Sequence, residues 1–532
     1  MVDSLKTKEV LAMYDVRGIQ NYIFHTNRIK EIIGASSIVD NIITDALDYI
    51  IEEQHLEKEK YLTDWTNDDC RAFLNDASIK MQVMFIGGGN AYVLFREGAV
   101  CELFNRKLAK YLLEYTYSLQ LAVAVIEKTD NYKNDYEVIN EKMGEIKSKM
   151  PSAKPLGAFP FMQVDSVTGA PAAGINRFDN KYVCKESLLK LDNYKEDKDA
   201  YENLLDNMVT QKGDSSFLAV VHIDGNNMGK RIKSIMQNQI KYDEAVCTMR
   251  EISKNLKDAF LDAYQEMDSY IEKRKAEIKP GYQGKLCRKL ILAGDDITFI
   301  CNAMVAMDAV KVFLKNVSEK AMYYDKSKTE DENLQKYGLS ACAGIAYMNS
   351  HFPFSDAYEV AEACCTSAKS RAKEMERRAS VKEKGEKNEK EEGMIGNFFD
   401  FQICNHVKTL ELDRHREKNY KVAGSEKSMI FRPYYVSSVR YDSLNDLNKK
   451  NMNFDYENIL VKNLLCFNKI SNSRSKMKAL RNAFSLGWEE VEKEIVFLKS
   501  RGVDLPSDTD KETWYDALEM MDLYVPDRGE VE

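Results

Sequence analysis

The sequence contains the same order of short apolar strands and helices twice. Each copy begins with a strand and a helical region, continues with two strands joined by a tight turn, and ends with a helix and a strand. The turns fall at matching places, because Gly89 follows Asp15 by 74 positions and Asp295 follows Asp224 by 71. This βαββαβ order with an antiparallel hairpin predicts two ferredoxin-like sheets, each with helices on one face.

The strands are predicted from their apolar residues, and the hairpins from the turn residues between them. In the first copy we expect strands at 11–15, 81–86, 91–95 and 121–126, with a helix over 101–117. In the second copy we expect strands at 217–224, 290–293, 297–300 and 339–348. Its first helix has apolar residues at intervals of three and four, which share one face: Ala245, Met249, Ile252, Leu256, Phe260, Ala263 and Met267.

Two stretches of unusual composition divide the chain. Four of the nine prolines lie between 151 and 171, and three glycines lie between 157 and 174, which indicates a connection between domains. The run at 382–393 is charged and lacks apolar residues, so it cannot support packing. We therefore expect an α+β protein, with its parts as follows: a first domain at 1–150, a linker at 151–210, a second domain at 211–380, a charged linker at 381–394 and a mainly helical C-terminal domain at 395–532.

The composition excludes several classes of protein. A chain of 532 residues, 44% hydrophobic and 30% charged, can build two or three cores, so a disordered chain or a small disulfide scaffold is excluded. The formal net charge of -9 gives no electrostatic footprint for indiscriminate binding to DNA or membranes. Eleven scattered cysteines without a Cys-x-x-Cys pair, and no signal-peptide core, predict reduced thiols in a cytoplasm. No membrane span is expected.

Three aspartates are predicted to meet at one edge of the second sheet. Asp224 ends an apolar strand, and Asp295 and Asp296 occupy the tip of the hairpin. In a βαββαβ sheet the first strand and the hairpin are neighbours, so the three carboxylates repel one another unless a cation lies among them. Magnesium prefers carboxylate and phosphate oxygens, and two such ions support nucleotidyl transfer. The alternative is that Asp295 and Asp296 are only turn residues.

The residues around these acids predict a phosphate site. A strand-to-helix turn with two glycines follows Asp224, and its backbone amides are suited to a triphosphate. A lysine on the helix after the last strand either reaches over the sheet end toward phosphates or lies on the surface. The candidate nucleotide-binding residues of this copy are Gly225, Asn227, Gly229, Lys230, Gly294 and Lys369.

The first copy lacks the equivalent acids. Gly89 and Asn90 occupy the positions of Asp295 and Asp296, so metal-dependent catalysis is not expected there. A glycine-rich hairpin, with Gly87 and Gly88 before them, still lets a ligand approach the backbone closely. We interpret this copy as a degenerate partner that holds a second nucleotide, or as a domain that serves only to pack.

The motif IDGNNMG at 223–229, the AGDD hairpin at 293–296 and the Ala-Lys pair at 368–369 resemble the second palm domain of the large subunit of type III CRISPR effector complexes. The stretch DVRGIQNYIF at 15–24, with Gly-Ala-Ser at 34–36, looks like the first palm of that family. The FRPY motif at 431–434 and the helical stretch after it look like the family's C-terminal part.

The resemblance implies an enzyme that converts ATP into cyclic or linear oligoadenylate second messengers in antiviral defence. Two Mg²⁺ or Mn²⁺ ions would bind Asp224, Asp295 and Asp296, and the two palms would hold the donor and acceptor nucleotides. It also adds Ser36 to the candidate nucleotide-binding residues of the first palm, which are otherwise Gly87, Gly88 and Asn90. CRISPR effector subunits and guide RNA are the implied partners.

The sequence departs from the family's pattern in three places. Asn226 stands where family members often have aspartate. Cys184 is alone in the region of the family's zinc-binding cysteines, so no zinc is expected. None of the six histidines precedes an aspartate, so we expect no HD nuclease and transfer no DNA cleavage.

Two other functions remain open. A cyclic-dinucleotide synthase of the GGDEF kind shares the palm and its metal-binding acids, but pairs two identical domains. A non-catalytic scaffold would use the palms to bind partners that contain guide RNA. The apolar residues of the C-terminal region would then form a docking surface, or else an ordinary helical core: Leu460, Leu464, Leu480, Phe484 and Trp488.

Overall fold

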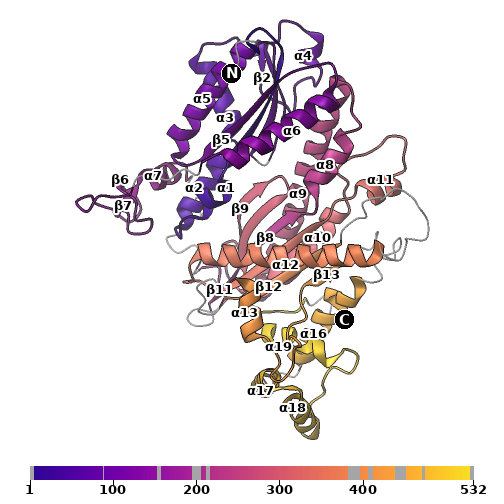
Figure 1. The fold of residues 1–532 in the computed structure, drawn as a ribbon. Helices are drawn as coiled ribbons and strands as arrows, with labels where there is room; N and C mark the ends of the chain where they lie inside the picture. Colours follow the sequence, from indigo (N-terminus) through magenta and orange to yellow (C-terminus); the bar gives the residue numbers. More distant parts are fainter. Residues whose placement is uncertain are drawn as a thin grey trace. The chain divides into compact units, whose positions relative to one another are not determined.

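The computed structural model describes residues 5–87, 89–151, 157–194, 205, 207–210, 216–380, 396–404, 411–437, 451–469 and 474–527. Its secondary structure is drawn in Figure 1. The chain forms two compact units. Unit 1 comprises Met1–Asp199, Asn227–Asp258 and Leu290–Asp296, and unit 2 comprises Ala200–Asn226, Ala259–Lys289 and Ile297–Glu532. The fold is α+β, with a ferredoxin-like sheet for each copy of the sequence repeat. The predicted charged linker at 381–394 lies outside the described residues.

The first copy of the repeat forms a five-stranded sheet. The strands are β1 (Val10–Arg17), β2 (Tyr61–Leu62), β3 (Met81–Gly87), β4 (Asn90–Phe95) and β5 (Gln120–Glu127), in the order β2-β3-β4-β1-β5. Strand β1 lies between β4 and β5 and pairs antiparallel with both, so that Asp15 faces Asn90 and Ala122. This is the predicted ferredoxin-like order with one short edge strand, β2, added.

Helices of the first copy pack on this sheet and on one another. Between β1 and β3 lie α1 (Ile19–Phe24), α2 (Ile29–Asp40), α3 (Ile42–Glu53) and α4 (Ala72–Asn75). Helix α5 (Gly98–Thr116) follows β4 and contacts β1, β4 and β5, and α6 (Tyr132–Lys149) follows β5 and contacts β5 and β1. The buried faces of α3 and α5 are lined by apolar residues spaced three or four apart, as amphipathic helices require.

Part of the segment that we expected to be a linker is folded. Residues 157–194 contain β6 (Ala172–Ile175), β7 (Tyr182–Cys184) and α7 (Lys185–Asp192), and α7 packs on α2. The contact is close, because a Cβ on Gly34 would lie 1.9 Å from the carbonyl oxygen of Lys190. The packing of α7 on α2 explains why a stretch rich in proline and glycine at its start still belongs to unit 1.

Two helices of the second copy also belong in whole or in part to unit 1. These are α8 (Met228–Met236) and the N-terminal half of α9 (Tyr242–Ile278), which runs on into unit 2 after Asp258. The backbone N–H of Tyr132 donates to the Ile240 carbonyl at 2.8 Å, just before α9 begins. Unit 1 is therefore larger than the first copy of the repeat.

The second copy forms a six-stranded sheet. Its strands are β8 (Phe217–Gly225), β9 (Cys287–Ala293), β10 (Asp296–Asn302), β11 (Ala341–Asn349), β12 (Asn397–Ile403) and β13 (Tyr434–Val436), in the order β13-β12-β11-β8-β10-β9. Strands β8 and β11 pair antiparallel, with Asp224 opposite Cys342. Strands β12 and β13 come from the region that we expected to be mainly helical. All seven residues of β12 are buried, and they cover the free edge of β11 in parallel register.

The other helices of unit 2 surround this sheet and form the C-terminal region. They are α10 (Ala306–Ser318), α11 (Glu330–Tyr337), α12 (Phe354–Ser380), α13 (Leu412–Asn419), α16 (Lys462–Lys469), α17 (Arg474–Leu486), α18 (Trp488–Ser500) and α19 (Trp514–Met520). Figure 1 shows the long α12 running across the second sheet. Leu460, Leu464, Leu480 and Phe484 are fully buried, so these apolar residues form a helical core and not an exposed docking surface.

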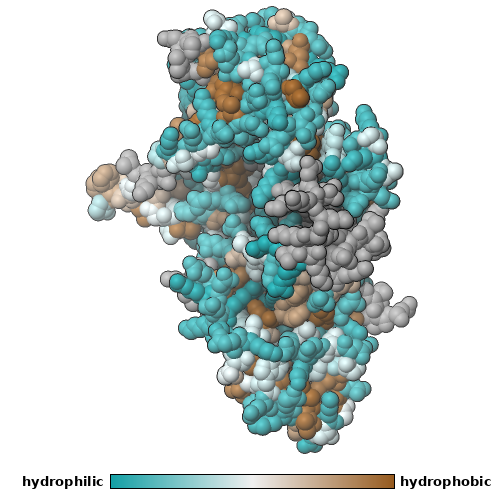
Figure 2. Space-filling view, turned by 45° about the vertical axis from the view of Figure 1, so that its right-hand side comes forward, coloured by the Kyte–Doolittle hydropathy of each residue, from teal (hydrophilic) through white to brown (hydrophobic). Residues whose placement is uncertain are grey.

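The surface is mostly hydrophilic, with scattered apolar residues (Figure 2). In the described part of the chain, no helix combines the length and the apolar character that crossing a bilayer requires. The sequence predicts that the cysteines are reduced, but Cys70 and Cys247 form a disulfide. The other nine cysteines are free.

Candidate functional site

Asp224 lies near the end of β8 with its carboxylate accessible. It is the penultimate residue of the strand, and its side chain is 40% exposed although the six residues before it are buried. The Nζ of Lys369, on α12, forms an ion pair with its Oδ2 and also donates to the Gly225 carbonyl oxygen at 3.2 Å. The structure thus brings together three of the predicted site residues: Asp224, Gly225 and Lys369.

The approach of α12 to β11 allows this ion pair. Gly344, in β11, faces the helix, and a Cβ there would lie 1.9 Å from the Ala361 carbonyl oxygen and 2.4 Å from the Cys365 nitrogen. The Cys365 thiol donates to the Cys342 carbonyl oxygen at 3.3 Å, which holds the helix beside the strand pair. Lys369 lies one helical turn after Cys365, so it projects from the same face.

The environment of Lys369 keeps it charged. Burial lowers the pKa of its ammonium group, but the attraction and hydrogen bond of the Asp224 carboxylate raise it more, so the pKa lies above the usual value of 10.5. Lys369 is therefore cationic over the physiological pH range. The predicted alternative, a lysine that lies on the surface, is not what the structure contains, since the side chain is 21% exposed.

The hairpin acids lie where the sequence predicts them. A two-residue turn joins β9 and β10, with Gly294 at a φ of 65°, which explains the glycine at the first turn position. Asp295 is the second turn residue, and Asp296 is the first residue of β10, the strand next to β8 in the sheet. The Gln20 side-chain amide, on α1, donates to the Asp296 Oδ2 at 3.2 Å. The role of Gln20 was not predicted.

Strand β10 contacts β8 through a buried side-chain pair. The Nδ1 of His222 lies 3.3 Å from the Thr298 Oγ1. Burial lowers the pKa of the His222 imidazole, which favours the neutral ring in this interior position. His222 is two residues before Asp224 along β8, and Thr298 is two residues after Asp296 along β10.

The carboxylate oxygens of these aspartates are of the chemical type that binds a hard cation. Carboxylate oxygens are the ligands that Mg²⁺ prefers, and Asp224 presents them to solvent. In the ranges that the structure describes, however, no group of three or more His, Cys, Asp or Glu residues is arranged to hold a metal ion. Because Lys369 engages the Asp224 Oδ2, an ion at this carboxylate must bind the other oxygen or displace the ammonium group.

Asn226 has a structural role. It is 3% exposed, and its side-chain amide donates to the Ser340 Oγ at 3.2 Å and to the Gly396 carbonyl oxygen at 3.4 Å. An aspartate could make neither of these donations. The asparagine at this position therefore belongs to a local network that uses its amide as a donor.

The predicted phosphate turn has an open backbone. Asn227 precedes α8 with a φ of 54°, in the left-handed region, and Gly229 and Lys230 are exposed on the first turn of that helix. A Cβ on Gly229 would meet no atom within 4 Å, so the helix start is open to an approaching group. Gly225 is buried at the end of β8.

The candidate residues of the first copy differ in accessibility. Asn90 begins β4 opposite Gly87 and Asp15, and its Oδ1 is buried with no hydrogen-bond partner among the described residues. Gly87 is exposed at the end of β3, whereas Gly88 lies outside the described residues. Ser36 is 6% exposed within α2, so a ligand cannot reach its hydroxyl without movement of the helix.

The first sheet contains an ion pair that was not predicted. The Lys147 Nζ, on α6, lies 2.9 Å from the Asp15 Oδ2. Asp15 occupies the place in β1 that Asp224 occupies in β8, and α6 follows the last strand of its sheet as α12 does. The matching order of the two copies was the available signal, since each contains an aspartate near the end of the first strand and lysines in the last helix.

The second copy matches a known domain family. Residues 217–381 fit the family model described as Cas10/Cmr2, second palm domain. Comparison with curated proteins found no match.

Several solved structures are similar to the chain at low sequence identity. Csm1 from T. onnurineus is 12% identical, with a TM-score of 0.49 over 97% of this chain and 70% of that one. A Csm1-Csm4 cassette in complex with AMPPNP is 13% identical, with a TM-score of 0.40 over 69% of this chain and 53% of that one. The cassette in complex with cA4 is 12% identical, with a TM-score of 0.42 over 97% and 70%. The chain thus spans about half the length of the protein that it matches in the cassette with AMPPNP. The family match is confined to residues 217–381, which contain most of the second sheet, and this part of the chain resembles a Cas10/Cmr2 second palm domain.

Proposed function

We propose that the chain is a metal-dependent nucleotidyltransferase that converts ATP into cyclic or linear oligoadenylates in CRISPR-type antiviral defence. The observation that carries the proposal is the contact between His222 and Thr298, because it suggests the register of β8 and β10. In an antiparallel pair, residues two positions further along one strand and two positions back along the other also face each other. We infer that Asp224 and Asp296 are such a pair, with Asp295 beside them.

In this proposal, Asp224, Asp295 and Asp296 would hold Mg²⁺ or Mn²⁺. When bound, the ions would lower the pKa of the attacking ribose hydroxyl and stabilise the leaving pyrophosphate. Gln20 would orient the Asp296 carboxylate through its hydrogen bond at 3.2 Å. No side-chain general base is then required.

Lys369 would have two successive roles. Without nucleotide, it neutralises Asp224 and limits the repulsion among the acids. Its Nζ also reaches the Gly225 carbonyl oxygen, at the start of the predicted phosphate turn. When a triphosphate binds, the Lys369 ammonium group would leave the Asp224 carboxylate and pair with a phosphate oxygen. The Asp224 carboxylate could then bind the cation. Gly225, Asn227, Gly229, Lys230 and Gly294 complete the proposed nucleotide site.

The first copy would present the acceptor nucleotide. Gly87, at its hairpin, is the exposed residue of the predicted set, and the partly buried Asn90 lies opposite it. We also propose that the chain acts with CRISPR effector subunits and guide RNA, as its Cas10-like second palm suggests.

A direct synthesis assay tests the proposal. Purified chain is incubated with labelled ATP and Mn²⁺, alone and with RNA, and the products are separated by chromatography. We expect oligoadenylates from the wild type and none from the folded double variant Asp295→Ala/Asp296→Ala. Product from GTP or from mixed nucleotides would instead indicate a GGDEF-like dinucleotide synthase. Synthesis that survives in the double variant would contradict the metal-dependent mechanism.

A non-catalytic palm is the second candidate function. It is favoured by the ion pair between Lys369 and Asp224, and by the lack of a preformed metal cluster in the described part of the chain. Under this hypothesis, the ammonium permanently replaces the cation. If neither Mn²⁺ nor Mg²⁺ binds the wild type in calorimetry, and no product forms under any condition, the scaffold is the better account.

A further inference from the structure

We propose that Cys70 and Cys247 form a reversible thiol–disulfide exchange site, which fastens the segment before α4 to the N-terminal half of α9. Both cysteines are half-buried, whereas eight of the nine free cysteines are buried and only Cys466 is more accessible. A dissolved thiol or disulfide can therefore reach this pair, while most of the other thiols are shielded from it.

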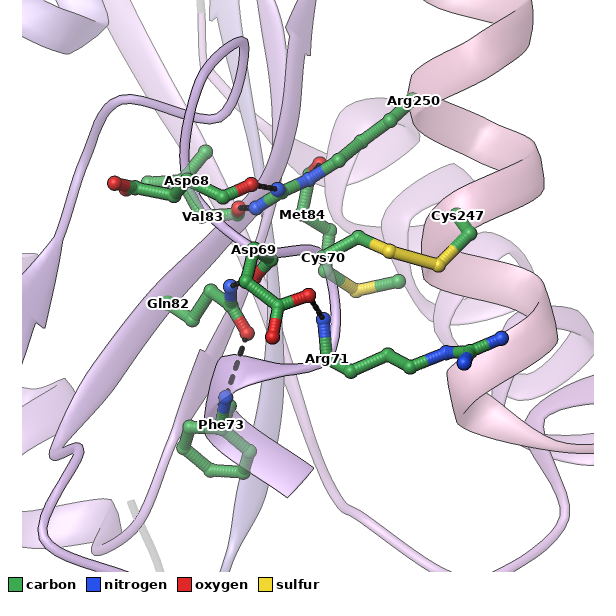
Figure 3. The surroundings of a disulfide bond; sticks show 10 residues. All are labelled: Asp68, Asp69, Cys70, Arg71, Phe73, Gln82, Val83, Met84, Cys247 and Arg250. Carbon is green, nitrogen blue, oxygen red and sulfur yellow. Dashed lines mark hydrogen bonds between the residues drawn. A yellow bond between two sulfur atoms is a disulfide. The ribbon is translucent and has the colours of Figure 1, made fainter. Parts of the chain in front are cut away.

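The polypeptide on the Cys70 side is held in place without the disulfide. The Gln82 side chain, on β3, donates to the Asp69 carbonyl oxygen at 2.7 Å and accepts from the Phe73 N–H at 3.0 Å. The Arg250 Nη1 donates to the Asp68 carbonyl oxygen at 2.6 Å. Figure 3 shows these bonds on both sides of Cys70. The position of Cys70 is therefore set by neighbours whose contacts do not involve sulfur.

The α9 side is anchored by the same arginine. Arg250 lies three residues after Cys247, which places it on the same side of the helix. Its Nε donates to the Met84 carbonyl oxygen at 2.9 Å and its Nη2 to the Val83 carbonyl oxygen at 2.8 Å, both on β3. With the bond to Asp68, one guanidinium joins α9, β3 and the loop of Cys70. After reduction, this arrangement would keep the two thiols facing each other.

The chemistry is an exchange with a small disulfide such as oxidised glutathione. One thiolate attacks a sulfur of that disulfide, which forms a mixed disulfide and releases one small thiol. The second thiolate then attacks the protein sulfur of the mixed disulfide and releases the other small thiol. Two protein thiols are oxidised, one small disulfide is reduced to two thiols, and two electrons are transferred. A small dithiol reverses the reaction.

The structural consequence is confined to unit 1. The disulfide joins residues 177 positions apart, so it restricts the unfolded chain strongly. In the oxidised form, the loop and the N-terminal half of α9 cannot separate, whereas in the reduced form they are held by noncovalent contacts alone, among them the bonds of Arg250. The redox state thus controls how readily this half of α9 leaves the first sheet.

The test uses the full chain in glutathione buffers of graded redox poise, with differential alkylation and peptide mass spectrometry. We expect Cys70 and Cys247 to change state together and reversibly, while the eight buried thiols stay unlabelled in the folded protein. We expect the reduced form to unfold at a temperature lower by about 5 °C. Cys466→Ser is the control and should leave both results unchanged. Independent titration of the two cysteines, or a pair that stays reduced in every buffer, would overturn the proposal.

A second variant separates the exchange site from simple proximity. Arg250→Ala removes the three bonds that align the loop with α9, whereas Arg250→Lys keeps the charge and one donor. After reduction and return to oxidising buffer, we expect the alanine variant to re-form the disulfide at least about tenfold more slowly, with mixed glutathione adducts at both cysteines. If the wild type and the alanine variant re-form it at the same rate, the alignment by Arg250 is wrong and the site is not preorganised.

Discussion

The two sheets contain the same ion pair, but they expose opposite partners. In the first sheet, the Asp15 side chain is 12% exposed and its partner Lys147 is 36% exposed. In the second, the Asp224 side chain is 40% exposed and its partner Lys369 is 21% exposed. The comparison teaches that an aspartate near the end of the first strand and a lysine on the last helix are a shared structural feature of the repeat. The carboxylate is more accessible to solvent in the second sheet than in the first.

The strand that faces this aspartate differs in a consistent way. In the first sheet, Asp15 faces Asn90, whose side chain is an uncharged amide. The single positive charge of Lys147 is therefore sufficient to balance the negative charge of Asp15. In the second, the first residue of the corresponding strand is Asp296, which adds negative charge near Asp224 in the proposed register. Carboxylates that lie close together repel one another, and a bound cation would relieve that repulsion in the proposed register.

The largest effect on synthesis should come from a comparison of two single variants, one at Asp224 and one at Asp15. Asp224→Asn should lower oligoadenylate synthesis by at least about 100-fold, because a group that stabilises charge in the transition state is lost. Asp15→Asn should retain synthesis and lower the free energy of unfolding by about 1 kcal/mol, since it breaks a partly buried ion pair. Chromatography of the products and denaturant unfolding provide the two measurements. Equal loss of synthesis in both variants would remove the distinction between the sheets.

A smaller effect, on the free energy of unfolding, should follow from substitutions that change the distance between a helix and its sheet. Gly344 and Ala124 occupy matching register positions, opposite His222 and Met13. Gly344→Ala should destabilise the protein by about 3 kcal/mol, because its Cβ would lie 1.9 Å from the Ala361 carbonyl oxygen. Ala124→Gly should cost only about 1 kcal/mol, through the flexibility of glycine in a strand. Urea unfolding would measure both, and a stable Gly344→Ala variant would show that α12 does not depend on this close approach.

Asn226→Asp tests the position two residues after the aspartate. In the second sheet the change removes the donors to Ser340 and Gly396, so we expect a loss of about 2 kcal/mol in unfolding free energy. In the first sheet the matching residue is Arg17, which donates to the Lys147 carbonyl oxygen at 2.9 Å. Arg17→Ala, which removes one partly exposed bond, should cost about 1 kcal/mol. If Asn226→Asp is stable and synthesises product faster, the position is a metal ligand and not a packing residue.

The smallest effect concerns pH. The pKa of Lys369 is raised in the folded chain, so its contribution to stability is complete below the usual lysine value of 10.5 and declines as pH rises through the higher folded value. The difference in unfolding free energy between wild type and Lys369→Met should therefore be constant from pH 7 to 10 and decrease above that range. Lys369→Arg should keep the difference small at every pH, because arginine stays charged. A difference that grows with pH would contradict the ion pair.

Local patterns accounted for most of the strands and for the hairpin of the site. The apolar runs and the turn glycines predicted β3 with β4 and β9 with β10 to within a few residues, because strand alternation and turn chemistry are properties of neighbouring residues. The domain boundaries could not be read in the same way. The fold of 157–194 and the addition of β12 to β11 depend on surfaces provided by other elements, such as α2 and the free edge of β11.

The amino-acid sequence by itself determined the repeated βαββαβ order, the positions of the aspartates near a strand end and at a hairpin, and the likeness of the second copy to a palm domain. Only the tertiary structure decided that Lys369 pairs with Asp224, that Gln20 reaches Asp296 and that Cys70 joins Cys247. These partners are 145, 276 and 177 residues apart. Such contacts depend on strand register and on how closely a helix approaches a sheet, and neither is encoded in the periodicity of a single segment.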